Sequence, residues 1–410
     1  MSSESWRLQK TGFRASGATQ MASIAIGHGV QHWYIAAFSV FLPLFQEEYV
    51  LSALSIAALV SIIEMGSGLP NFFVGYISDR LRNYWHFLLP ASLLGAAGAY
   101  MLAGISPWYW GIVACLALGG AASAFWHPPA ISMLSTRFPT RRGMVIAFHG
   151  AGSGAGEALG PLGVGIILAF LLADNWRLYV LLSMFPALLL AGLLYWVLSG
   201  GGQQPQDEER VKVTLTSMVP LLHQPVFMTL ICANMMRSFA HIGLLTFLPL
   251  YLAIDLDMSS AGVGLHVALL TLLGVPGGPI YGYLSDRIGR RIPILVAMVS
   301  ISAGMLAMGI AGSGVPLAIA LGLTGGFLWA VQDVVNATAM DAAQPGTEGT
   351  VVGLMFTSTF LGGALAPLVA GVVVSVTGER SSVFFMSAVV MMLTVPLLVF
   401  APLRRRTLVM

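Results

Sequence analysis

The chain has 410 residues, of which 57% are hydrophobic and only 9% are charged, and its formal net charge is +2. Soluble domains carry about 25% charged residues, and a soluble fold of this composition would expose large apolar patches. A lipid bilayer is therefore expected to solvate most of the surface. The small net charge gives no indication of a nucleic-acid partner.

The two cysteines, Cys115 and Cys232, lie inside apolar runs. They form no CxxC pair and no disulfide framework, so we expect buried free thiols. The first apolar run begins near Ala18 and is too long for the apolar core of a signal peptide.

Twelve apolar runs have the length of a membrane-spanning helix, which needs about 20 residues. The least distinct breaks between consecutive runs lie at Ser106–Pro107 and near Gly312. The longest polar segment predicts a cytoplasmic linker at 200–222 between two six-helix bundles, 1–199 and 223–410. The predicted spans are 18–46, 52–78, 84–105, 107–135, 142–173, 176–199, 224–253, 259–284, 292–312, 314–341, 348–376 and 381–402.

The predicted spans place most of the Lys and Arg residues on one side of the membrane. Basic residues mark cytoplasmic loops, so we expect a multi-pass protein of the cell membrane, in a bacterium the inner membrane, with both termini in the cytoplasm. The opposite side holds Arg177 and Arg380, and its loops are acidic. The predicted cytoplasmic side holds 16 of the 19 Lys and Arg residues: Arg7, Lys10, Arg14, Arg80, Arg82, Arg137, Arg141, Arg142, Arg210, Lys212, Arg287, Arg290, Arg291, Arg404, Arg405 and Arg406.

The two halves of the sequence repeat each other at an offset of 206 or 207 residues. FLPLF at 41–45 returns as FLPLY at 247–251, and ALGP at 158–161 returns as ALAP at 364–367. An even number of spans in each copy makes the copies parallel, and parallel repeats of transporters bind substrate between them near the middle of the membrane. The fold class predicted is an all-α membrane protein of twelve transmembrane helices in two parallel six-helix repeats.

A loop motif occurs once in each half, as GYISDRLRN at 75–83 and GYLSDRIGRR at 282–291. Both copies follow the second helix of their half. They resemble the signature loop of the major facilitator superfamily, although the first copy has Arg82-Asn83 where the family has a Gly-Arg pair. The resemblance implies the major facilitator fold and gating roles for Asp79, Arg80, Asp286 and Arg287.

The fifth span carries a glycine series that allows two interpretations. Gly152, Gly154, Gly156 and Gly160-Pro161 have a spacing that lets helix backbones approach closely. The series also resembles the fifth-span antiporter motif of the superfamily's exporters, with an imperfect final glycine pair. Generic helix packing and a role in export both remain open.

A narrower resemblance points to the fosmidomycin-resistance branch of this superfamily. It rests on the sequence GHGVQH at 27–32 and AFWHPP at 124–129. The branch has an acid where this chain has His32, and Trp126 interrupts its F-H-P pattern. Because these departures fall on polar positions within the membrane, substrate and coupling are not carried over.

Polar residues inside the spans are functional candidates, because a bilayer makes them costly. Those of the first span share one helix face, as do those of the seventh. We expect a small-molecule site formed by His28, Gln31, His32, Trp126, His127, Asn234, Arg237, His241, Asp333 and Asn336.

Arg237 cannot lose its proton in a protein and needs a counter-charge. That partner is either an anionic substrate or an internal acid such as Asp333 or Glu157. Carboxyl groups within the membrane can carry a coupling proton, so Glu157, Glu64 and Asp333 are the candidates for proton coupling.

Histidines of the first, fourth and seventh spans allow two further roles. Imidazole titrates near neutral pH and also binds transition metals. No sequence spacing beyond His28 and His32 supports a metal, so we predict no metal and no cofactor, with a proton gradient as the energy source. His149 and His266 are assigned to packing.

These observations favour a monomeric secondary transporter rather than an enzyme or a receptor. The sequence has no HExxH, GxSxG or Walker A motif. The function predicted is proton-coupled efflux, by alternating access, of a small organic compound, with an anion as one candidate. The alternative is a proton-coupled uptake symporter for an organic acid, a metal chelate or a similar nutrient.

Overall fold

The structure is a computed structural model that describes residues 16–138, 141–200, 223–341 and 348–400. These residues form helices and short connections, with no strand among them. The predicted linker 200–222 lies almost entirely outside the described residues. The elements of the first half are α1 (Gly17–Tyr49), α2 (Ala53–Arg80), η2 (Arg82–Tyr84), α3 (Trp85–Ile105), α4 (Tyr109–Ala124), α5 (His127–Arg137), α6 (Arg142–Leu171) and α7 (Trp176–Leu198).

The second half has the corresponding helices, but its second span is the interrupted one, whereas in the first half the fourth span is interrupted. The expected breaks between the third and fourth spans of each half are confirmed, since α3 ends at Ile105 and α12 ends at Ala311. The elements are α9 (Pro225–Leu250), the π-helical turn η4 (Tyr251–Asp255), α10 (Ser260–Leu272), α11 (Gly274–Ile288), α12 (Arg291–Ala311), α13 (Val315–Asp341), α14 (Glu348–Thr377) and α15 (Ser382–Phe400).

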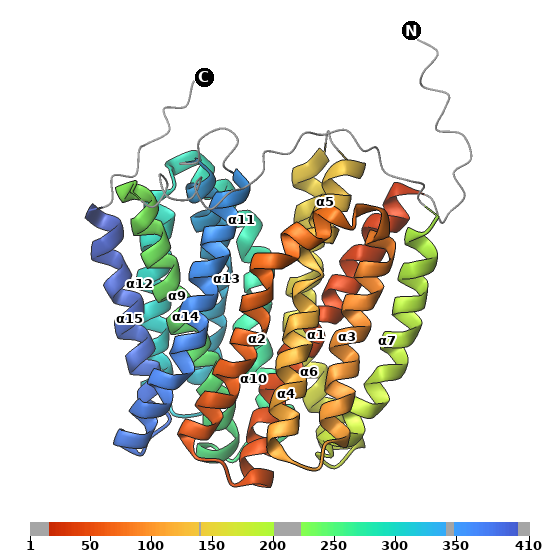
Figure 1. Ribbon diagram of the computed structural model, residues 1–410. Coiled ribbons are helices and arrows are strands. Elements are labelled where there is room, and N and C mark those ends of the chain that lie inside the picture. Colours follow the sequence, from red (N-terminus) through yellow and green to blue (C-terminus); the bar gives the residue numbers. More distant parts are fainter. Residues whose placement is uncertain (1–15, 139–140, 201–222, 342–347, 401–410) are drawn as a thin grey trace.

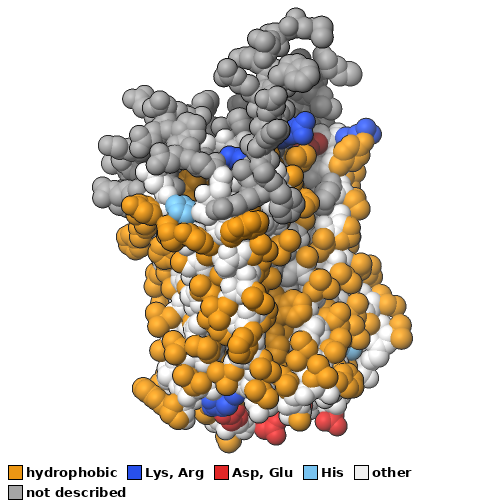
Figure 2. Space-filling model, turned by 90° about the vertical axis from the view of Figure 1, so that its right-hand side faces the viewer, with side chains coloured by type: hydrophobic (Ala, Val, Ile, Leu, Met, Phe, Trp, Pro, Cys, Tyr) orange, Lys and Arg blue, Asp and Glu red, His pale blue; other side chains and the backbone are white. Residues whose placement is uncertain are grey.

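Eleven segments of the described residues are long and apolar enough to cross a membrane. Two of them are interrupted, because α4 with α5 and α10 with the start of α11 each make one span. α1 has 33 residues, about 50 Å of helix, but polar residues such as His28, Gln31 and His32 lower its hydropathy. It lies among the other helices, so the structure is consistent with twelve spans (Figure 1). On the face seen in Figure 2, hydrophobic side chains cover the middle of the surface, and charged side chains gather toward its two ends.

The helices pack into two groups, each around an apolar core, and the core of the first group extends to side chains of the second such as Phe247 and Ala370. In one group, α1 contacts α6 and α7, and α3 contacts α4 and α7. In the other group, α9 contacts α14 and α15, and α13 contacts α10, α11 and α12. One core centres on side chains such as Phe41 and Trp126, and the other on side chains such as Phe227 and Met305. Both cysteines are free, but they are half-buried rather than buried, which corrects the expectation for Cys115 and Cys232.

Two helix pairs make the main contacts between the groups, α2 with α14 and α6 with α10, and α1 makes a smaller contact with α9. We call the end of the bundle that holds residues 81 and 289 the motif end, and the other the opposite end. Gly371 of α14 lies against the start of α2 at Ala53 and Ala57, and Gly165 of α6 lies against the start of α10 at Ser260. The groups therefore touch at the opposite end.

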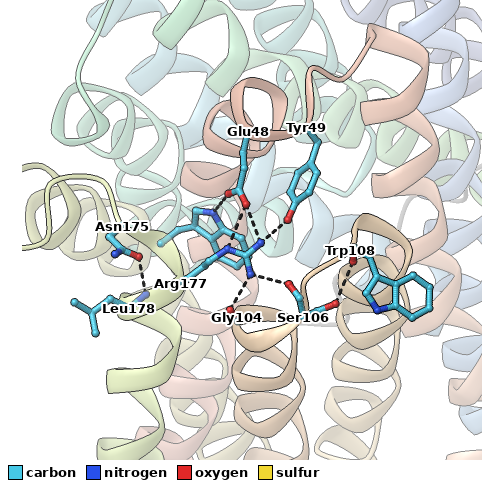
Figure 3. Close-up of polar contacts among 9 residues, drawn as sticks. Glu48, Tyr49, Gly104, Ser106, Trp108, Asn175, Arg177 and Leu178 are labelled. Carbon is cyan, nitrogen blue, oxygen red and sulfur yellow. Dashed lines mark hydrogen bonds and ion pairs between the residues drawn. The ribbon is translucent and has the colours of Figure 1, made fainter.

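An ion pair at the opposite end fastens each group. Arg177 at the start of α7 contacts Glu48 at the end of α1, with Nη2 2.8 Å from Oε1, and also donates to the carbonyl oxygens of Gly104 and Ser106 at the end of α3 (Figure 3). In the second group Arg380, just before α15, lies 3.1 Å from Asp255 in η4. These are the two arginines of the acidic side.

Replacing Arg177 is expected to destabilise the protein more than replacing Arg380. Arg177→Ala removes the ion-pair partner of Glu48, which keeps its hydrogen bond from Trp176, and leaves two helix-end carbonyls without their side-chain donor. We expect a loss of about 1–3 kcal/mol, whereas Arg380→Ala removes one surface ion pair worth about 0–1 kcal/mol. Thermal unfolding of both purified variants in detergent measures the difference. Equal midpoints would contradict the role given to Arg177.

Candidate functional site

The fourth span is interrupted between α4 and α5. α4 ends at Ala124, and α5 begins at His127 and continues with two prolines that have no N–H. Proline is well accommodated in the first turn of a helix, where an N–H would have no partner. Trp126 lies in the break, is fully buried, and occupies the space that a side chain at Gly27 of α1 would need. The break therefore docks α5 against α1.

Glycines bring α1 and α6 into close contact. A Cβ added at Gly156 would meet the carbonyl of Gly29, and one at Gly152 would meet another carbonyl of α1. Gly160 lies against the backbone of Trp33 in the same way. Small residues permit such an approach between helices in a membrane.

The other face of α6 packs across the molecule on α10. Gly165 lies against the backbone of Gly264, and a side chain at Gly264 would collide with the carbonyl of Pro161. The glycine series of the fifth span thus has a packing role on both sides of α6. This role is the same for either direction of transport.

Four histidines of the first half meet between α1, α5 and α6, and we call His28, His32, His127 and His149 the histidine cluster. His28 Nδ1 donates to the carbonyl oxygen of His149 at 2.8 Å, and the two rings stack with centroids 3.8 Å apart. His28 Nε2 lies 3.2 Å from His127 Nε2. The ring of His32, one turn along α1, is 4.7 Å from that of His28.

His149 was assigned to packing, yet it belongs to this cluster. Its ring is buried, and its Nε2 accepts a hydrogen bond from Trp126 Nε1 at 3.2 Å. The sequence did contain a signal, because His149 precedes Glu157 by eight residues and so lies on the same face of the helix. Only the fold shows that this face meets His28.

Glu157 lies where the histidine cluster meets the other half. Its Oε1 is 2.7 Å from His32 Nδ1, and the two side chains are 16% and 15% exposed. At this distance they form an ion pair when the ring is protonated. The backbone carbonyl of Glu157 accepts a hydrogen bond of 3.3 Å from Thr271 of α10. Glu157 therefore faces His32 and not Arg237.

Gln31 lies on the same helix as His28 but has a different contact. It is fully buried, and its Nε2 donates to Ser92 of α3 at 3.3 Å. The structure thus gives Gln31 a contact between helices of the first half.

In the second half, Arg237 of α9 is buried among amides. Its Nε donates to Asn234 Oδ1 at 3.3 Å, and its Nη2 donates to Gln332 Oε1 of α13. Gln332 in turn donates to Asn336 at 3.0 Å. Within the described part of the chain no carboxylate lies within ion-pair distance of Arg237, although Asp333 is close enough to attract its charge.

The remaining predicted residues of this half flank Arg237. Asn234 donates to the carbonyl of Met355 and to two hydroxyls of α14, so it joins α9 to α14. His241 is 7% exposed and meets the ring of Trp329 edge-on at 5.1 Å. Asp333 is exposed, with one oxygen over Gly278 of α11.

Glu64 of α2 lies at the second contact between the halves. A Cβ added at Gly363 of α14 would lie 3.2 Å from Glu64 Oε2. Gly363 is the counterpart of Glu157 at the repeat offset of 206. Each of these two contacts therefore includes one carboxylate, Glu157 of α6 at the α6–α10 contact and Glu64 of α2 at the α2–α14 contact.

The sequence model of the Major Facilitator Superfamily matches residues 24–367 and 252–409. The chain belongs to this superfamily. It is a multi-pass membrane protein of a family whose members are transporters.

Two relatives cover most of the chain. It is 23% identical over 371 residues to the fosmidomycin resistance protein of Escherichia coli K12, which covers 89% of this chain and 87% of that protein. It is 25% identical over 383 residues to the hexuronate transporter of Bacillus subtilis 168, with 86% of each covered. A shorter match, 35% over 162 residues, links 36% of the chain to the multidrug resistance protein MdtG of Enterobacter lignolyticus.

A solved structure shows the same fold. It is that of a bacterial homologue of the human lysosomal transporter Spinster in an inward-facing and unoccupied conformation. The TM-score is 0.75 at 15% sequence identity, with 96% of each chain covered. This likeness concerns the fold alone.

The superfamily's loop motif is described fully only in its second copy. Asp286 lies 2.6 Å from Arg290, which also pairs with Asp341 at the end of α13 at 3.0 Å. The guanidinium of Arg287 lies over the ring of Tyr283, 4.6 Å from its centroid. These contacts stay within the second half. The side chains of the predicted gating residues Asp79 and Arg80 lie outside the described residues.

The close contact of α1 and α6 gives a test by substitution. Gly156→Leu is expected to separate the helices and to lower the thermal midpoint and transport together, because its side chain has no space beside Gly29. Gly150→Leu, six residues earlier on α6 where a Cβ meets nothing within 4 Å, is the matched control. Equal stability of the two variants would show that the glycine contact is not required.

Proposed function

We propose that this transporter exports a small organic anion in exchange for protons, by alternating access of its two halves. The observation that carries this proposal is Arg237, a buried cation whose direct described partners are neutral amides. The proposal includes a bacterial inner membrane with both termini in the cytoplasm, as the distribution of Lys and Arg predicts.

Arg237 has the chemistry of an anion site. A guanidinium has five N–H donors in a planar fork that fits carboxylate or phosphate. Asn234 and Gln332 accept from only two of the guanidinium nitrogens. An uncompensated buried charge is costly, and a bound anion would remove that cost. His241 and Trp329 stand beside this position with ring nitrogens that have no described partner.

The proton sites are proposed at the contacts between the halves. His32 and Glu157 share one pair at the α6–α10 contact, and Glu64 lies at the α2–α14 contact. Protonation of either carboxylate removes a charge from a surface that must slide during alternating access. A proton can thus change the relative stability of two conformations, which is what coupling requires.

The contacts between the halves support an inward-facing state. They begin at the opposite end, with Gly165 and Gly371, and continue to mid-span at Glu157 and Glu64. If the motif end is cytoplasmic, these contacts separate the Arg237 region from the outside.

The names of the relatives favour export, with one specific argument for uptake. Two relatives are named for resistance to fosmidomycin or to many drugs, and resistance is consistent with export of such compounds. A third is named a hexuronate transporter, and a hexuronate is an organic acid of the kind that a nutrient symporter would take. Uptake of an organic acid with protons is therefore the second candidate. Everted membrane vesicles decide between them: with an acidified lumen, which corresponds to the outside, an exporter concentrates the anion in the lumen and a symporter depletes it.

Arg237→Ala is expected to reduce transport of an anionic substrate by more than about 30-fold, since loss of a partner from a buried charge-assisted pair costs about 2–5 kcal/mol. The thermal midpoint should not fall much, because the substitution removes a buried charge. Substrates are first found by ligand-induced thermal stabilisation across organic acids and antibiotics. Arg380→Ala, at the membrane surface, is the control, and unchanged transport in Arg237→Ala would remove Arg237 from the site.

Glu157→Gln is expected to abolish uphill transport driven by a pH gradient while leaving downhill exchange of substrate intact. The amide keeps the shape of the side chain but carries no titratable proton. Both activities are measured in proteoliposomes, with Glu64→Gln as the parallel variant at the other contact. Uphill transport by Glu157→Gln would contradict its coupling role.

A further inference from the structure

We propose that His28, His32 and His127 bind a divalent transition-metal ion of the zinc class within the first half. The ligand atoms of these three side chains lie within 4.8 Å of one another. The proposal is independent of the transported substrate and of the direction of transport, because it concerns three residues of one bundle.

The distance between two of the ring nitrogens suits a shared ion. His28 Nε2 and His127 Nε2 are 3.2 Å apart. Two nitrogens bound tetrahedrally to zinc at 2.0–2.1 Å lie about 3.3 Å from each other. These two imidazoles therefore already lie at the edge length of a zinc tetrahedron, and His32 supplies the third nitrogen from one turn along α1.

The groups behind the rings are those that orient metal-binding histidines. A ligating histidine commonly donates its second ring N–H to a carbonyl or carboxylate. His28 Nδ1 donates to the carbonyl of His149, which leaves the lone pair of the neutral ring on Nε2. His32 Nδ1 faces Glu157 at 2.7 Å, which directs its Nε2 away from the carboxylate. The stacked ring of His149 supports His28 from the other side.

An internal hydrogen-bond network satisfies these rings less well. Without an ion, His127 Nε2 must carry the proton that it shares with His28 Nε2. His32 Nε2 is buried and has no polar partner among the described residues. Buried polar atoms are normally satisfied. A cation bound by the three imidazoles would engage His28, His127 and His32 at once.

The chemistry of the three ligands indicates which ions they can bind, and their position in the fold shows which helices the ion would join. Imidazole suits zinc, copper, nickel and iron, and three protein ligands leave one coordination position of zinc for water or an anionic group. The ligands come from α1 and α5, with outer groups on α6. The ion would hold these elements of one half together and leave the two halves free to move.

The test is zinc binding by the purified full-length protein, after removal of any polyhistidine tag. Isothermal titration with Zn²⁺ in detergent is expected to show one site per chain, and Co²⁺ is expected to give the intense visible absorption of a four- or five-coordinate complex. His32→Ala should weaken Zn²⁺ binding by at least about 100-fold, and Glu157→Gln by about 10-fold as an outer-shell change.

His32→Ala is the decisive variant because Glu157, which is 16% exposed, is the polar partner described for its ring, so the substitution leaves the contacts of His28 and His127 in place. His127→Ala should act in the same direction, and thermal unfolding confirms that each variant is folded. His266→Ala, in α10, is the matched control and should bind like the wild type. Absence of Zn²⁺ binding by the wild type would overturn the proposal. Equal binding by His32→Ala and the wild type would also overturn it, because it would indicate an adventitious ion only.

Discussion

The close packing of α6 between α1 and α10 is the contact on which the rest of the arrangement depends. On one side Gly152 and Gly156 allow the backbone of α6 to reach that of α1, and on the other Gly165 lies against α10. In a bilayer, apolar area alone gives helices little reason to associate, so such small-residue contacts decide which helices meet. The contact brings His149 and Glu157 beside the polar face of α1.

The two halves have the same arrangement of helices but different polar residues. The first half holds imidazoles and one carboxylate, with His32 beside Glu157. The second holds the fixed charge of Arg237 among amides, and Gly363 stands where the repeat would place a counterpart of Glu157. Because Gly363 has no side chain, Glu64 of α2 can lie against it. In our proposals, the first half binds a proton and a metal ion and the second half binds an anion.

The interruption of the fourth span places His127 where a continuous helix would not place it. The break before Pro128-Pro129 lets α5 begin at His127, and the buried ring of Trp126 fills the space beside Gly27. Unpaired backbone groups are tolerated at membrane depth only inside protein or in water-filled space. Buried Trp126 shows that this break lies inside protein, so its position fixes where His127 meets His28.

The sequence by itself determined the membrane environment, the spans, the parallel repeat and the superfamily. These conclusions come from features that can be seen along the chain without knowledge of the fold. The length of the apolar runs indicates the membrane and the spans, the offset of 206 residues indicates the repeat, and the GYxSDR motif indicates the superfamily. The sequence also placed His28 and His32 on one face, since that follows from helical periodicity. It left the counter-charge of Arg237 open between an anionic substrate and an internal acid such as Asp333 or Glu157.

Only the tertiary structure decided which of these polar residues meet. It paired Glu157 with His32, placed His149 in the histidine cluster, turned Gln31 toward Ser92 and brought His127 to within 3.2 Å of His28. The physical reason is that these contacts join residues 61 to 125 positions apart on helices whose rotation and depth are set by packing. Spacing along one helix shows which residues share a face, but the neighbouring helix decides what that face touches.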